Sequence, residues 1–487
     1  MNFSVKEKLS EEEIKEGLKN IIKDGLATQA MITLTGGVFL VSFALMLGAS
    51  NTIIGLLAAI PPLSQLIQIP AIYLVEKFRA RKAICVYTSA ISRSFWLIVI
   101  LAPLLNKESA LVLLIIALLS HTIFSAISNC SWNSWLHDLL PKQKLGDFFS
   151  RRMSYSMILA ISLSMSAGFF IDYVKSNMPE LALYSYSIVF LIGYIAGMIG
   201  VYFISNIPEP KMCSTKTDFK SLLREPFKDE NFKNLLAFSG SWAFAVNLAS
   251  PFFTVYMLKM LGLSLSFVIV LVILSQITSL IFLRVWGKIA DSYSNKSVLS
   301  VSSPLFLICI LAWTFTTMPE KHILSIPLLI IIHILMGISL AGVNLASRNI
   351  ALKLSPKAKA TSYLAAHNII NSISAGIAPI IGGNLADFFA NRELDWKIVY
   401  SSPNRIVDIP MLSFQQWDFF FFFAFLIGLY SIHRLAMVKE GKEVEKKVVI
   451  NKLFAEVKRP VRNFATAGGI YVFQYPFKNL KIRKSKG

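Results

Sequence analysis

The side chains that could do chemistry in this sequence are a few polar residues set within long apolar stretches. His121 and Ser125 lie four residues apart in one stretch, and His333 lies in a later one. A histidine can exchange a proton near neutral pH and can donate or accept hydrogen bonds. Other apolar stretches carry further polar side chains, namely Gln65, Trp242, Asn247, Gln276 and Asn371. Such groups can bind a small polar solute, but they can equally hold helices together by hydrogen bonds.

Arg93 is the one charged residue found near the centre of an apolar stretch. About ten residues into its stretch, it would lie ~15 Å deep in a helix that rises about 1.5 Å per residue. An ionisable residue at such depth is a functional hypothesis by default. Arg93 could bind substrate, or it could bond backbone carbonyls and serve the structure. No Asp or Glu is found at a comparable depth, which disfavours cationic substrates and favours neutral or anionic ones.

Helices that cross a membrane must position these residues. The chain has 487 residues, of which 55% are hydrophobic and 16% are charged, whereas a soluble domain averages roughly 25% charged residues. Hydrocarbon offers the backbone no water to bond, so runs of about 20 apolar residues form spanning helices. We therefore predict an all-α polytopic membrane protein with twelve spans, near residues 27–48, 52–75, 83–104, 109–131, 153–174, 183–206, 234–258, 262–286, 298–318, 324–349, 358–385 and 416–436.

The basic residues predict the orientation. The chain carries 48 Lys and Arg residues and has a formal net charge of +20. Of these 48 residues, 40 fall in connections on one side of the predicted spans. Basic residues gather on the cytoplasmic side of membrane proteins, so we expect both termini in the cytoplasm and the chain in a cell (inner or plasma) membrane. This distribution accounts for the charge without nucleic acid, and we expect a monomer in the lipid bilayer.

The sequence repeats itself at an offset of 215 residues. This offset carries Asn129 onto Asn344, and it carries a Gly-x-x-x-Asp pattern ending at Asp172 onto one ending at Asp387. Two six-helix halves in the same orientation follow. The predicted division is a cytoplasmic amphipathic segment 1–26, a first bundle 27–207, a cytoplasmic linker 208–233, a second bundle 234–436 with an external insertion 388–415, and a basic cytoplasmic tail 437–487.

The stretch GKIADSYSNKSV, residues 287–298, interrupts the apolar pattern between two spans of the second half. Gly287, Asp291 and Lys296 fit the spacing Gly-x-x-x-Asp-x-x-x-x-(Arg/Lys). Together with the repeat, this motif resembles the signature of the major facilitator superfamily, twelve-helix type. The resemblance implies two pseudo-symmetric six-helix bundles that move a small solute by alternating access. The upstream copy departs from the pattern, because Glu76 stands where aspartate is usual.

The resemblance also implies a latch of charges that closes the cytoplasmic side. We expect Asp291 to meet the Arg151–Arg152 end of the fifth span, and Glu76 to meet the start of the eleventh. Gly287 is expected to let helices pack closely. The alternative is that these charges are solvated loop residues. The candidate latch residues are Glu76, Arg79, Arg81, Asp138, Arg151, Arg152, Gly287, Asp291 and Lys296.

In the resembled family, substrate binds between the halves on helices one, four, seven and ten. Span four presents a polar face with Ser125 and Asn129, and span ten presents one with Asn344 and Arg348. The candidate cavity residues are Gln65, Arg93, His121, Ser125, Trp242, Asn247, Gln276, His333 and Asn371. Span five lacks the proline-containing signature of drug antiporters, which weakens that interpretation.

The predicted function is secondary active or facilitative transport of a small neutral or anionic solute, with or without a coupling ion. The alternative is a non-transporting membrane sensor or scaffold that works through the basic tail, which could bind anionic lipid or be disordered. The four cysteines are dispersed, and no nucleophile–base pair or metal-ligand spacing is found. We therefore expect neither enzymatic activity nor a cofactor or bound metal.

Overall fold

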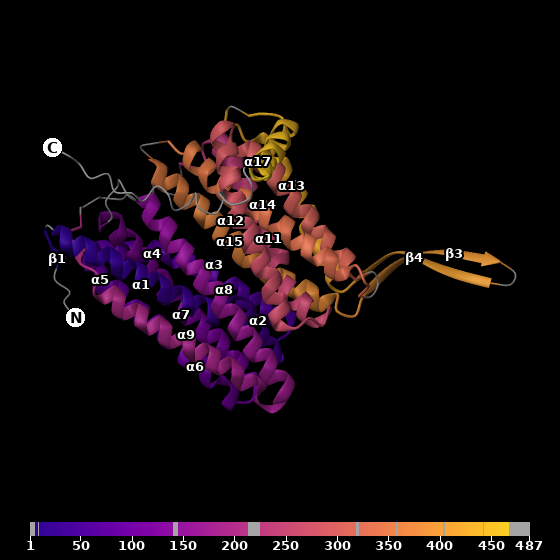
Figure 1. Ribbon diagram of the computed structural model, residues 1–487, viewed down its shortest axis with the longest axis horizontal. Coiled ribbons are helices and arrows are strands. Elements are labelled where there is room, and N and C mark those ends of the chain that lie inside the picture. The colour runs from indigo at the N-terminus through magenta and orange to yellow at the C-terminus, as the bar shows by residue number, and fades with distance from the viewer. Residues whose placement is uncertain are drawn as a thin grey trace.

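Two bundles of helices lie side by side in the computed structural model (Figure 1). It describes residues 5–7, 9–139, 145–212, 225–317, 321–356, 359–402, 405–441 and 443–466. Within these ranges, twelve spans are long and apolar enough to cross a membrane. The predicted all-α, multi-pass architecture is confirmed.

The first half holds six spans, three of which are broken into two helices each. The first span breaks at Gly37, whose positive φ of 54° favours glycine. The helices are α1 (Glu11–Thr35), α2 (Gly37–Met46), α3 (Asn51–Ser64), α4 (Gln68–Phe78), α5 (Arg81–Ser94), α6 (Trp96–Leu101), α7 (Lys107–Leu139), α8 (Leu145–Asn177) and α9 (Ala182–Ser205).

The second half repeats this arrangement with longer unbroken helices. Its core is aromatic: the rings of Phe253 and Trp313 stack at a centroid distance of 4.5 Å, and Phe421 packs against both. The helices are α11 (Glu230–Lys259), α12 (Leu265–Ser292), α13 (Asn295–Ala312), α14 (Ser325–Leu354), α15 (Ala360–Phe388) and α16 (Trp417–Met437).

The structure differs from the predicted boundary at residue 26. Helix α1 begins at Glu11, where Ser10 and Glu13 form a capping box, and it continues through the expected boundary into the first span. The side chains of Ile21 and Asp24 are buried, because this part of α1 packs against α9. Residues 11–26 are therefore the first turns of the first helix rather than a separate segment.

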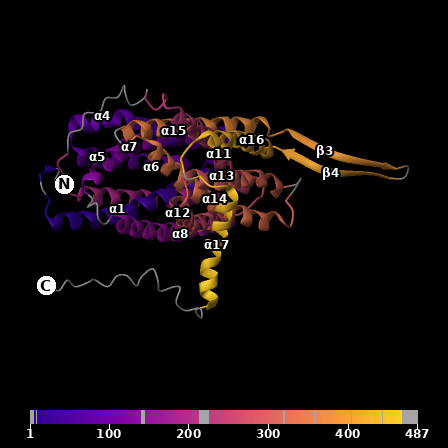
Figure 2. The same ribbon diagram turned by 90° about the horizontal axis from the view of Figure 1, so that it is seen from above.

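Two pairs of strands distinguish the two ends of the bundle. At one end, here the linker end, β1 (Val5–Lys6) pairs with β2 (Glu209–Pro210). At the other, the hairpin end, β3 (Glu393–Ser402) and β4 (Arg405–Gln415) form an antiparallel hairpin that extends away from the helices (Figures 1 and 2). The predicted insertion 388–415 contains this hairpin.

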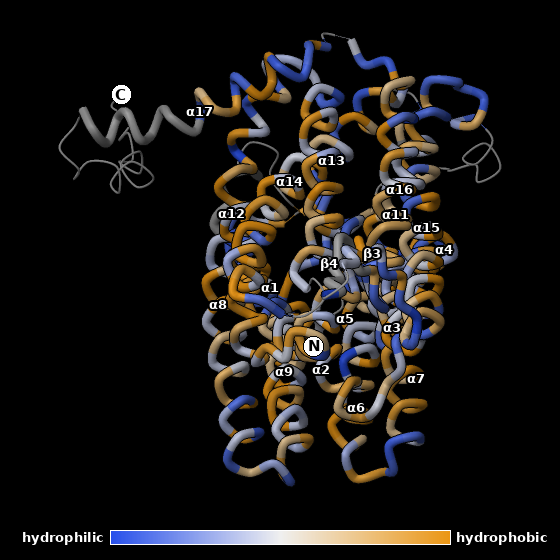
Figure 3. Tube along the Cα trace, turned by 90° about the vertical axis from the view of Figure 1, so that its right-hand side faces the viewer, coloured by the Kyte–Doolittle hydropathy of each residue, from blue (hydrophilic) through white to orange (hydrophobic). Residues whose placement is uncertain are grey.

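The last helix, α17 (Lys446–Thr466), contacts α12 and α13. It runs across the bundle rather than along it (Figure 2). Figure 3 shows that the helices are mostly hydrophobic along their lengths, while hydrophilic residues gather at their ends and in the connections. This pattern is what a bundle that spans a bilayer requires.

Candidate functional site

Two aspartates join the halves at the hairpin end. Asp172 in α8 accepts hydrogen bonds from the first two N–H groups of α12, at 3.1 and 2.8 Å. Asp387 in α15 accepts hydrogen bonds from the first two N–H groups of α3, also at 3.1 and 2.8 Å. The first N–H groups of a helix have no partner within it and attract negative charge. Each half therefore caps a helix of the other.

The same end is packed backbone against backbone. A Cβ atom on Gly55 of α3 would collide with the carbonyl oxygen of Pro379 in α15, and one on Gly383 would lie 2.8 Å from the Cα atom of Thr52. Only glycine allows α3 and α15 to approach so closely. The hairpin end is closed by this packing and by the two aspartate caps.

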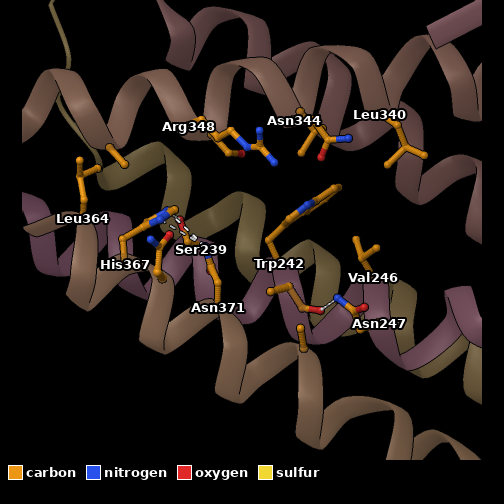
Figure 4. Close-up of a pocket in the computed structure, with 16 residues that line it drawn as sticks. Ser239, Trp242, Val246, Asn247, Leu340, Asn344, Arg348, Leu364, His367 and Asn371 are labelled. Atoms are coloured by element: carbon orange, nitrogen blue, oxygen red, sulfur yellow. Dashed lines mark hydrogen bonds between the residues drawn. The ribbon is translucent and has the colours of Figure 1, made fainter. Parts of the chain in front are cut away.

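A cavity of about 420 Å³ lies between α11, α14 and α15, nearer the linker end than the contact of α3 with α15. Figure 4 shows its labelled side chains converging from these three helices. Trp242, Asn247 and Asn371, three of the predicted cavity residues, line it. Asn344 and Arg348, which the sequence placed on the polar face of span ten, also line it. The sequence analysis did not name three further polar residues of the lining, Ser239, Ser347 and His367.

Hydrogen bonds hold part of this lining in place. The Oγ atom of Ser239 lies 3.0 Å from Nε2 of His367, and the Asn371 amide lies 3.3 Å from Nδ1 of the same ring. Other polar atoms have no partner among the described residues: the buried Oγ of Ser347 and Oδ1 of Asn371. Arg348 is exposed to the cavity, and no hydrogen bond or ion pair joins it to the described part of the chain.

A second cavity, of about 190 Å³, lies at the equivalent place in the first half. The offset of 215 residues relates the two linings: Asp24 corresponds to Ser239, and Asn129 corresponds to Asn344. It also relates Arg152 to His367. The predicted residues Arg93, His121 and Ser125 line this second cavity. The internal repeat thus places the two polar cavities symmetrically.

Arg93 has a carboxylate partner that the sequence analysis missed. Its guanidinium lies 3.8 Å from Oδ1 of Asp24, donates to Oγ1 of Thr28 at 2.9 Å, and donates to the carbonyl oxygen of Gly197. Both charged side chains are at most 7% exposed. The prediction that no acidic residue lies at depth is therefore wrong, because Asp24 belongs to the first spanning helix and not to a segment before it.

His121 and His333 occupy different surroundings. His121 lines the second cavity, with Nδ1 at 3.0 Å from Oγ of Ser92. His333 is buried, bonds the carbonyl oxygen of Leu329 at 2.8 Å, and packs against the Trp313 ring. His333 thus lies in the core of the second half and outside the two symmetric cavities.

The two remaining cavity candidates are Gln276, on α12, and Gln65, which directly follows α3. Gln276 lines a third cavity of about 250 Å³, where α12 of the second half meets α1, α2 and α8 of the first. This cavity includes the break at Gly37. Gln65 is exposed and accepts a hydrogen bond from Gln68. Gln276 is therefore placed between the halves. Gln65 is exposed in a short helical turn, Gln65–Ile67, which contacts α15 of the second half.

Two predicted latch residues, Arg81 and Asp138, join in a charge network within the first half. The fully buried Arg81 side chain donates to Oδ2 of Asp138 at 2.5 Å, and its Nε lies 3.6 Å from Glu209. Glu209, which the sequence analysis did not select, also caps the first N–H group of α5 at 2.7 Å. Burial raises the pKa of the Glu209 carboxyl, although hydrogen bonds from the Lys82 and Arg81 N–H groups oppose the shift.

The second half repeats this network with other charges. Lys296 contacts Glu443 at 2.8 Å, and Oε2 of Glu440 accepts a hydrogen bond from the Lys296 backbone N–H at 2.6 Å. Glu440 also pairs with Lys353 at 3.0 Å. Burial alone would raise the pKa of Glu443, but hydrogen bonds from Lys296 and from the Glu440 and Gly441 N–H groups hold it below its ordinary value. Both networks fasten the linker-end loops within one half.

The expected contact of Asp291 with Arg152 is not formed. Asp291 is exposed at the end of α12, and within the described ranges no ion pair joins it to Arg152. The guanidinium of Arg152 instead lies against Gly25 of α1. The side chain of Arg151 lies outside the described residues.

Three other latch candidates are also placed. A Cβ on Gly287 would lie 3.9 Å from Leu345, an ordinary contact, so the expected close packing at this glycine is wrong. Close packing occurs instead at Gly342, where a Cβ would lie 2.7 Å from Cβ of Ser302. Arg79 is exposed and ends α4 with a positive φ of 48°. The expected contact of the half-buried Glu76 with the start of α15 stays a prediction.

Solved structures share this arrangement of helices. A mutant form of the nucleoside transporter NupG matches with a TM-score of 0.62 at 14% identity, over 88% of this chain and 100% of its own. A bacterial homologue of the iron transporter ferroportin in an inward-facing state matches with a TM-score of 0.60 at 11% identity, over 88% and 99%. A bacterial metal transporter matches with a TM-score of 0.59 at 13% identity, over 88% and 98%. These likenesses show the fold.

Sequence comparison adds the family. The uncharacterized MFS-type transporter YxiO of Bacillus subtilis (strain 168) is 25% identical over 122 residues, which is 25% of this chain and 27% of that relative. The family model described as Major Facilitator Superfamily matches residues 25–379 and 235–462. Since these matches cover most of the chain and the twelve spans form the two symmetric bundles, the chain belongs to the major facilitator superfamily.

Proposed function

We propose that this protein moves a small neutral or anionic solute across a membrane by alternating access, as a secondary active or facilitative transporter. One observation carries the proposal. The reciprocal caps of Asp172 and Asp387 close the bundle at the hairpin end, while the two symmetric polar cavities lie toward the linker end. A transporter whose hairpin end is closed, and whose polar site lies toward the linker end, is in one of its two access states.

The distribution of basic residues orients this state. Lys and Arg residues gather in the connections at the linker end, which is the side expected to face the cytoplasm. On this proposal the protein lies in the cell (inner or plasma) membrane, its linker end faces the cytoplasm, and the access state is the cytoplasm-open one. Opening the hairpin end requires breaking the aspartate caps and separating α3 from α15.

A reversible crosslink tests this proposal. Thr52 Oγ1 and Asn384 Oδ1 lie 3.3 Å apart across the closed end, so a Thr52→Cys/Asn384→Cys pair, in a background without native cysteines, can form a disulfide there. Solute counterflow into proteoliposomes should stop on oxidation and return with a thiol reductant. Each single cysteine variant is the control. Unchanged counterflow after complete crosslinking would rule out alternating access through this end.

A sensor or scaffold is the second candidate, because α17 is held across the linker end. Lys288 of α12 pairs with Glu456 of α17 at 3.0 Å, so motion of the second half would be passed to this helix. Deleting residues 446–487 distinguishes the two candidate functions experimentally. Counterflow should survive the deletion if transport is the function, whereas a sensor would lose its output.

A further inference from the structure

We propose, on the basis of the transport function above, that the solute is a small organic anion that also carries a hydrogen-bond donor, and that Arg348 binds its negative charge. The guanidinium of Arg348 points into the cavity between α11, α14 and α15 (Figure 4). Among the described residues, none that lines this cavity is acidic. Within the described part of the chain, Arg348 has neither an ion pair nor a hydrogen bond.

The two arginines that line the second cavity, Arg93 and Arg152, both lie near a carboxylate. Arg93 is neutralised by Asp24 and donates to Thr28 and Gly197. The second arginine at that cavity, Arg152, lies against Gly25, beside the same Asp24. Since one carboxylate faces two guanidinium groups there, each of the symmetric cavities keeps one positive charge. A cleft lined with one sign of charge and walls of low dielectric concentrates ions of the opposite sign.

Two unpartnered atoms define the rest of the solute. The buried Ser347 hydroxyl stands next to Arg348 in the chain and can donate to the same anion. The buried Oδ1 of Asn371 can only accept, so it requires a hydroxyl or N–H group. Buried polar groups are nearly always hydrogen-bonded. A solute with both an anionic group and a donor satisfies both atoms.

The remaining lining fits a carbon skeleton of metabolite size. The Trp242 ring and the side chains of Val246 and Leu340 form an apolar wall of the cavity. Its volume of about 420 Å³ falls within the range of about 300–1,000 Å³ that is usual for small-molecule sites. Hydroxy acids, amino-acid-like anions and sugar acids have this combination of charge, donor and size.

Matched probe pairs test the charge. Each pair consists of a hydroxy acid anion and its amide: lactate with lactamide, gluconate with gluconamide, and mandelate with mandelamide. Purified protein is tested for thermal stabilisation and proteoliposomes for counterflow. At least one acid, and not its amide, should bind and exchange. Arg348→Gln should weaken its apparent affinity by about 10- to 100-fold, as expected for a lost charge-assisted hydrogen bond, and Arg348→Lys should recover part of it.

A second measurement requires no knowledge of the solute. Iodide and caesium ions both quench tryptophan fluorescence but carry opposite charges. The difference in quenching between the native protein and Trp242→Phe gives the contribution of Trp242. Iodide should quench Trp242 severalfold more than caesium, and Arg348→Gln should remove most of this preference. Arg405→Gln, on the exposed hairpin, removes the same charge far from the cavity and should change nothing.

The outcomes separate the two proposals. Exchange of amides as efficiently as acids, with an unchanged Arg348→Gln variant, would overturn the anion proposal and leave transport standing. Equal quenching by iodide and caesium would also overturn it. Counterflow that persists through the Thr52–Asn384 crosslink would instead rule out alternating access through the hairpin end. An acid that stabilises the protein through Arg348 but shows no counterflow would remove the transport function and leave anion binding standing.

Discussion

Asp172 and Asp387 stand 215 residues apart, at equivalent positions of the two halves, and each caps a helix of the opposite half with the same pair of distances, 3.1 and 2.8 Å. The repeat in the sequence therefore becomes a reciprocal contact in space. Since these contacts join the halves at the hairpin end, they must break before this end can open.

Neutralising the caps should open the hairpin end. Replacing each carboxylate by an amide removes the negative charge that faces the helix N-terminus. This weakens the stabilisation by each cap by about 0.5–2 kcal/mol. The Asp172→Asn/Asp387→Asn protein should therefore label faster than the parent at Ala49→Cys, a site only 2% exposed beside α3. The measurement is the rate of maleimide labelling in a background without native cysteines. The matched control is Glu108→Gln, which removes an exposed carboxylate in the first turn of α7. Equal labelling rates in the Asp172→Asn/Asp387→Asn protein and its parent would exclude a role of the caps in closure.

Asp24→Asn should destabilise the first half severely. It leaves Arg93 buried without its counter-charge, and breaking a buried pair in this way costs about 3–5 kcal/mol. The melting temperature of the purified protein should fall, and the double variant Asp24→Asn/Arg93→Gln should recover much of the loss. A double-mutant cycle measures the coupling. Independent, additive effects of the two substitutions would show that the pair does not act as one unit.

Two glycine substitutions should have opposite outcomes. Gly55→Ala pushes a Cβ into the Pro379 carbonyl oxygen, whereas Gly287→Ala meets only Leu345 at 3.9 Å. Forcing an extra methyl group into tight packing costs about 1–3 kcal/mol. Gly55→Ala should thus speed labelling at Ala49→Cys or lower the melting temperature, and Gly287→Ala should do neither. A silent Gly55→Ala variant would contradict the closeness of α3 and α15.

Acid should weaken the charge network of the second half. The pKa of Glu443 is held below its ordinary value of 4.5. A depressed carboxyl pKa contributes stability that is present above 4.5 and is lost as pH falls through the lower folded-state value. Melting temperatures measured across this range should therefore drop more for the native protein than for Glu443→Gln. The drop should be small, because the Glu443 side chain is 36% exposed. Glu445→Gln, an exposed neighbour, should follow the native curve.

The sequence predicted the spans and the symmetry because both are properties of the local pattern. Long apolar runs require helices in a bilayer wherever they occur, and the 215-residue offset is visible without any contact. For the same reason the sequence showed that Asp172 and Asp387 occupy equivalent positions of the repeat. It did not show which helix each of them caps.

Contacts between helices far apart in the chain were decided only by the tertiary structure. Arg93 was predicted to lie at depth, but its partner Asp24 belongs to a helix 69 residues earlier, whose start the hydropathy pattern placed too late. His121 and His333 look alike in sequence, yet one lines a cavity and the other packs on Trp313. Which face of a helix meets a cavity depends on the rotation and tilt that packing against its neighbours imposes.

The sequence by itself thus determined the number of spans, their twofold repeat and the distribution of charge along the chain. The tertiary structure decided which end is closed, which charges are paired, and that Arg348 has no partner among the described residues around its cavity. The physical reason is that the hydropathy pattern is a property of a single helix, whereas ion pairs and cavities form where different helices meet.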